Sequence, residues 1–134
     1  MCLVVYIGSA SPLATTERWS RECPAFHAVP LRPHEEIVRQ HLGTRYVLYA
    51  GSFEDCGCGF GYESEAQFEH DIAGIPESYA ESSRQDREQC RQSARALRSY
   101  VEQAIQKGAV RVLVSWAGQE ATAPRASRTV TPAF

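Results

Sequence analysis

The chain has 134 residues, of which 43% are hydrophobic and 22% are charged, and its formal net charge is −2 at pH 7. This length and composition are typical of one globular domain with a single core. The small net charge gives no general attraction to nucleic acid or to anionic membranes, and no stretch approaches the roughly 20 apolar residues of a membrane-spanning helix.

Three continuous apolar runs predict strands that are buried on both faces. They cover residues 2–7, 45–50 and 110–116, and each is followed by a turn that contains glycine. If these strands are parallel neighbours, the two Gly-Ser turns meet at the edge of the sheet where α/β proteins bind ligands. Ser9 and Ser52 are therefore candidate ligand contacts. Residues 26–31, bounded by prolines, predict a short edge strand.

Helices are predicted at 33–42 and 84–107, with a weaker one at 63–72. Proline and acidic residues begin the first helix, Ser83 is the expected cap of the long one, and glycine follows both. Because helices separate the strands, we expect parallel pairing within a small α/β domain. We assign residues 1–118 to this single domain, with a three- to five-stranded mixed sheet and two or three helices. Residues 119–134 form either a disordered tail or an added edge strand.

The segment 51–62 combines four of the nine glycines with two of the five cysteines. Glycine at this density allows sharp bends or close backbone approach. Cys56 and Cys58 can bring two sulfurs to one metal ion, and zinc prefers four nitrogen or sulfur ligands. Cys23 and His27 are the expected second pair, with Cys2 as an alternative fourth ligand because its strand can lie beside the one that feeds the loop. Zinc is thus the candidate cofactor.

Two other interpretations of the cysteines remain open. Cys56 or Cys58 can be a nucleophilic or redox thiol, with the loop N–H groups stabilising an anion. Alternatively, the two cysteines are small structural residues in a tight turn. An odd number of cysteines, with no basic segment before the first apolar run, indicates a cytoplasmic protein with reduced thiols.

Five arginines at positions 84, 87, 91, 95 and 98 lie within an arc of roughly 80° on the long predicted helix. Such a row can contact nucleic acid or an acidic partner, and Arg87, Arg91 and Arg95 are the candidate contacts. The net charge of −2 favours a solvated helix flank over a nucleic-acid site. Association of identical chains is left open.

The opening Met-Cys-Leu-Val-Val-Tyr-Ile, the Tyr-Ala-Gly-Ser of residues 49–52 and the Cys-Gly-Cys-Gly-Phe of residues 56–60 form one set of motifs. They resemble a group of small uncharacterised bacterial proteins with a Gly-Ser…Cys-Gly-Cys-Gly-Phe signature. The resemblance covers the N-terminal half and implies a bacterial cytosolic origin without implying a reaction. Our functional expectation is a binding or interaction module built around residues 51–62, with the thiol enzyme and the arginine-row binder as alternatives.

Overall fold

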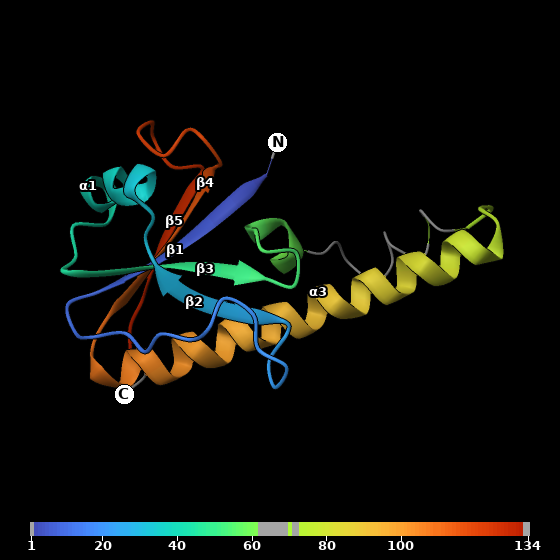
Figure 1. The fold of residues 1–134 in the computed structure, drawn as a ribbon, viewed down its shortest axis with the longest axis horizontal. Coiled ribbons are helices and arrows are strands. Elements are labelled where there is room, and N and C mark those ends of the chain that lie inside the picture. Colours follow the sequence, from blue (N-terminus) through green and yellow to red (C-terminus); the bar gives the residue numbers. More distant parts are fainter. Residues whose placement is uncertain (1, 62–69, 71–72, 133–134) are drawn as a thin grey trace.

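The computed structural model describes residues 2–61, 70 and 73–132 as one five-stranded sheet with a long helix across one face (Figure 1). The strands are β1 (Leu3–Ser9), β2 (Phe26–Pro30), β3 (Tyr46–Ser52), β4 (Val110–Trp116) and β5 (Ala126–Val130). The helical elements are η1 (Pro33–Val38), α1 (Arg39–Leu42), η2 (Gly57–Phe60), α3 (Glu77–Ala104) and η3 (Ile105–Lys107). The predicted small α/β domain is confirmed. No helix in the described part of the chain has the length and apolarity needed to cross a membrane.

The strand order is β2-β3-β1-β4-β5, and all four neighbouring pairs are antiparallel. The expected parallel pairing is therefore wrong. In the β1–β3 register Val5 lies opposite Ala50 and Ser9 lies opposite Tyr46. The two Gly-Ser turns consequently lie at opposite ends of the sheet and do not gather at one edge. The same register puts the start of β1 beside the end of β3.

Apolar side chains cover both faces of the central strands, as the continuous runs predicted. On one face, Val4 and Tyr6 of β1 pack with Val38 of η1 and Leu42 of α1. On the other face, Val5 and Ile7 pack in a cluster that includes Val101 of α3. Alternate residues of β1 thus belong to two different core layers, and this central strand carries no exposed face.

The long helix begins earlier than the sequence pattern indicated. It starts at Glu77 after Pro76, whereas we expected a start at Arg84 with Ser83 as its cap. Proline fits the start of a helix as well as it breaks one, and nothing after Pro76 interrupts the helical conformation. The weaker helix predicted at 63–72 lies outside the described residues apart from His70.

The segment after β2 differs in detail from the predicted helix, whereas the segment after β4 contains the edge strand that was one of the two expectations. The first predicted helix is a 3₁₀ turn that continues into one turn of α-helix, and Gly43 ends it with a left-handed φ of 63°. Within residues 119–134, β5 pairs with β4 as an edge strand.

Ser93 of α3 connects the helix to the loop that follows β3. Its side chain is fully buried, and its hydroxyl donates to Ala25 O at 2.7 Å and accepts the N–H of Phe53 at 3.1 Å. Two backbone groups outside regular structure therefore depend on one hydroxyl. This contact places the segment that carries the two loop cysteines.

Replacing Ser93 with alanine is expected to lower the free energy of unfolding by about 1–3 kcal/mol, because two buried backbone groups lose their partner. Urea denaturation followed by circular dichroism measures the change. Ser99→Ala, at an exposed position of the same helix, is the control and is expected to change stability by less than about 0.5 kcal/mol. Equal effects of the two substitutions would contradict a linking role for Ser93.

Candidate metal centre

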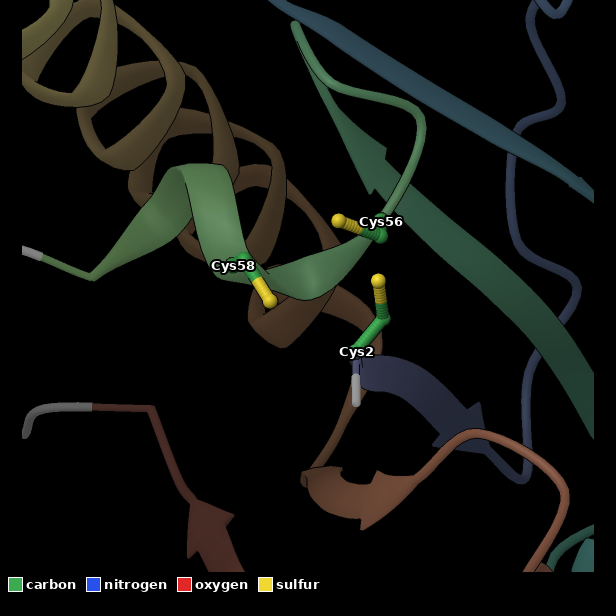
Figure 2. Close-up of side chains that lie close together, drawn as sticks. All are labelled: Cys2, Cys56 and Cys58. Carbon is green, nitrogen blue, oxygen red and sulfur yellow. The ribbon is translucent and has the colours of Figure 1, made fainter.

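Three cysteine sulfurs converge where β1 begins and the chain returns from β3. The Sγ atoms of Cys2, Cys56 and Cys58 lie within 4.8 Å of one another. Figure 2 shows Cys2 at the start of β1 directing its sulfur toward Cys56, while Cys58 projects from η2 toward the same space. Cys2 is exposed and the other two are partly buried, so one side of the group faces solvent.

The glycines next to these cysteines are required by close packing. A Cβ atom at Gly57 would lie 2.8 Å from Val5 Cγ2 and 3.1 Å from Leu3 O. At Gly59 a Cβ atom would lie only 2.2 Å from Ser52 Oγ. The loop can approach β1 and the end of β3 this closely only because these two positions have no side chain.

Hydrogen bonds hold the turn in this position. The Ser52 hydroxyl donates to Cys56 O at 2.5 Å, and the Ser52 N–H donates to the same oxygen at 3.2 Å. The N–H of Leu3 donates to Cys58 Sγ at 3.2 Å, which connects β1 directly to the loop sulfur. Asp55, with a left-handed φ of 64°, reverses the chain just before Cys56.

The electrostatic environment keeps the Cys56 thiol protonated in the metal-free protein. Burial, with the neighbouring Cys58 and Cys2, raises the pKa of Cys56 to about 11. A bound dication would reverse this preference, because it stabilises thiolates directly. The group is therefore better suited to binding a metal ion than to presenting a free thiolate.

Three sulfurs at these separations are close to the arrangement that zinc requires. Zn–S bonds of about 2.3 Å at tetrahedral angles place sulfurs about 3.8 Å apart, so shifts of up to about 1 Å would bring the group onto an ion. Three protein ligands leave one position for water or for an external ligand. Cuprous ions, which also favour thiolates, match the same donor set.

The structure brings only some of the predicted ligands together. Cys56 and Cys58 come together with Cys2, the alternative ligand, in the one such sulfur group among the described residues. Cys23 is exposed in the loop before β2 and lies outside this group. His27 also lies outside it, because its ring turns toward Asp55.

His27 belongs to a polar cluster on the neighbouring side of the loop. Its Nε2 lies 2.8 Å from Asp55 Oδ1, poorly aligned for a hydrogen bond, and its ring covers Gly51. Arg18 Nη1 donates to the same Asp55 oxygen at 2.7 Å, and the hydroxyl of Tyr49 donates to the Asp55 carbonyl oxygen. These contacts fix the loop just ahead of Cys56. The sequence does not reveal these contacts, because their residues are far apart in the chain and meet only in the folded structure.

A second polar group that the sequence did not indicate lies beneath η1. The hydroxyl of Tyr6 donates to Glu35 Oε2 at 2.8 Å and lies 3.4 Å from Glu120 Oε1, and all three residues are buried. Burial raises the pKa of Tyr6 well above its ordinary value. The sequence predicts Glu35 only as an acidic residue at the start of a helix, and there its other oxygen accepts the Arg32 N–H at 3.0 Å.

Most of the remaining candidate contacts are buried or paired within the chain. Ser9 and Ser52 are each 2% exposed, and the Ser9 hydroxyl accepts the N–H of Ser11. In the arginine row, Arg87 is buried and Arg91 lies 3.5 Å from Glu88, while Arg95 is exposed. Arg84 and Arg98 form ion pairs at 3.0 Å with Glu77 and Glu102. Acids of the same helix thus offset much of the row's charge.

Comparison of the chain with protein-family models, with curated proteins and with solved structures found no match.

The free energy of unfolding is expected to fall at mildly acidic pH, because His27 then becomes protonated. Burial lowers the pKa of His27 below its ordinary 6.5, Arg18 and Arg32 add to this, and Asp55 opposes it. Since the folded state prefers the neutral ring, the stabilisation is complete above about pH 6.5 and declines as the pH falls through the lower folded pKa.

Urea unfolding at about pH 7.5 and about pH 5.5 tests this, with His27→Gln compared with the wild-type protein. The variant is expected to lose less stability on acidification, whatever its absolute stability. The matched control is His34→Gln, which removes an exposed histidine by the same substitution. An identical pH dependence in His27→Gln and wild type would contradict the expectation.

Proposed function

We propose that this protein is a metal-binding module that holds one thiophilic ion, Zn²⁺ in the first instance, on Cys2, Cys56 and Cys58. The observation that carries the proposal is the convergence of three sulfurs within 4.8 Å from two segments that are distant in sequence. Chance proximity of exposed groups is a weaker explanation, because closely packed glycines and a direct Leu3–Cys58 hydrogen bond hold the two segments together.

The donor set favours zinc or cuprous ion over hard cations. Thiolates are soft ligands, and Mg²⁺ and Ca²⁺ are bound by oxygen. With three protein ligands, the ion would keep one position for water or for a group from a partner. The exposure of Cys2 leaves that position accessible, which suits a binding or interaction role.

The second candidate function is a thiol enzyme or redox protein that uses Cys58. It is favoured by the N–H of Leu3, which donates to Cys58 Sγ at 3.2 Å and would stabilise a thiolate. The raised pKa of Cys56 disfavours that neighbouring cysteine as the thiolate, and His27 faces Asp55 and lies outside the sulfur group. Binding of an acidic partner through the arginine row is less favoured still, because neighbouring acids already pair with several of these arginines.

The protein purified under reducing conditions is expected to bind about one zinc ion per chain by elemental analysis. Cys58→Ser and Cys2→Ser should each weaken zinc affinity by at least about tenfold in a chelator competition, because the loss of a thiolate removes more than 1.4 kcal/mol. Zinc at a hundredfold excess over its Kd should also stabilise the wild-type fold by about 2.7 kcal/mol.

Cys23→Ser is the matched control, since Cys23 is another exposed cysteine outside the sulfur group. It should retain full zinc binding. A loss in Cys23→Ser equal to that in Cys58→Ser would favour the ligand set expected from the sequence. Metal-free protein whose Cys58 reacts rapidly with alkylating reagents near neutral pH would instead favour the thiol enzyme.

A further inference from the structure

On the face of the sheet that α3 covers, the edge formed by β4 and β5 is only partly covered. α3 packs against β2 and β3, while a cavity of about 610 Å³ opens between its C-terminal half and β4–β5. Along β4, Leu113 points to the other face and is fully buried, whereas Val112 and Val114 are only partly buried. The half-buried valines therefore face the cavity, which α3 borders without filling it.

The cavity is lined by aliphatic side chains from α3, η3, β4 and β5. The larger of them are Leu97, Val101, Ile105, Val112, Val114 and Val130. Its volume falls within the roughly 300–1,000 Å³ of small-molecule sites. Among the described residues, the lining holds no Trp, Tyr, Phe or Met, which are enriched at protein–protein interfaces, although two arginines, also enriched there, lie in it. An aliphatic small molecule matches this surface better than a protein partner does.

The charges at the rim select the sign of the ligand. Arg98 and Glu102 line the rim as an exposed pair, with Arg98 Nε 3.0 Å from Glu102 Oε1. Arg128 of β5 also lines the cavity, and it pairs with no acid among the residues that the structure describes. After the Arg98–Glu102 pair is set aside, one positive charge remains beside an apolar cavity.

We propose that this cavity binds an aliphatic carboxylate, with the hydrocarbon chain against the valines of β4 and β5 and the carboxylate on the guanidinium of Arg128. Arginine binds carboxylates through two parallel hydrogen bonds, so it provides geometry as well as charge. The lining supplies the remaining affinity by removing the chain from water. This site uses none of the sulfur ligands and is independent of metal binding.

A second copy of the chain is the main competing occupant. The edge of β2 is protected, because the Thr16 N–H donates to Ala28 O at 2.8 Å and Pro30 ends the strand. The outer edge of β5 shows no comparable cover among the described residues. Pairing of two β5 strands would place another chain beside the cavity, so the test must distinguish this from ligand binding.

The probe is cis-parinaric acid, whose fluorescence rises in an apolar site, titrated in parallel with its uncharged methyl ester. The full-length protein should bind about one molecule of the acid saturably and should bind the ester more weakly. Arg128→Gln should weaken acid binding about tenfold and leave ester binding unchanged. Arg125→Gln is the matched control, because Arg125 lies over the Trp116 ring, 5.1 Å from its centroid, and does not line the cavity.

Val114→Trp should abolish binding of both probes by filling the cavity, with thermal melting used to check that the variant folds. The Arg128→Gln comparison does not depend on that variant. The proposal is overturned if neither probe binds saturably, or if the acid binds no better than the ester and Arg128→Gln has no effect. It is also overturned if sedimentation shows a stable dimer that Val112→Glu converts to a monomer, since a second copy would then cover this face.

Discussion

The antiparallel pairing of β1 with β3 is the constraint on which the candidate metal centre depends. It places the first residues of β1 beside the last residues of β3, and the loop after β3 then folds back over that end. A parallel arrangement would have put Cys2 at the opposite end of the sheet from Cys56. Hydrophobic burial of the strands on both faces stabilises the register, because a shift by one residue would exchange the two core layers.

The strands and the cysteine-bearing loop could be predicted from the sequence, whereas the strand directions could not. The apolar runs located the strands because a strand buried on both faces needs continuous apolar residues, and the density of glycine identified the loop that carries the cysteines. Strand direction could not be read from them, since an apolar run has the same composition whichever way it pairs. The sequence therefore identified Cys56 and Cys58 but offered Cys2 only as an alternative to Cys23 and His27. His27 lies on β2 opposite Gly51, with its ring near Asp55, and this placement follows from a strand order that composition does not reveal.

α3 connects the two parts of the molecule that we consider functional. Near its middle, Ser93 holds the loop after β3 through Phe53, and one to three turns later its apolar face forms a wall of the aliphatic cavity. The two sites use different chemistry, soft sulfur donors in one and aliphatic surface beside a single cation in the other. Their separation follows from the sheet order, because the cysteines gather around β1 and β3 whereas the cavity borders β4 and β5.

The position of Cys2 has a mechanical consequence. β1 is the middle strand of the sheet, and Cys2 directly precedes its first residue. An ion bound to Cys2, Cys56 and Cys58 would tie the interior strand to a loop more than fifty residues away, so fraying of β1 at that end would first require a metal–sulfur bond to break. Occupancy would thus govern local opening at the centre of the sheet, whereas most strand ends that fray lie at its margins.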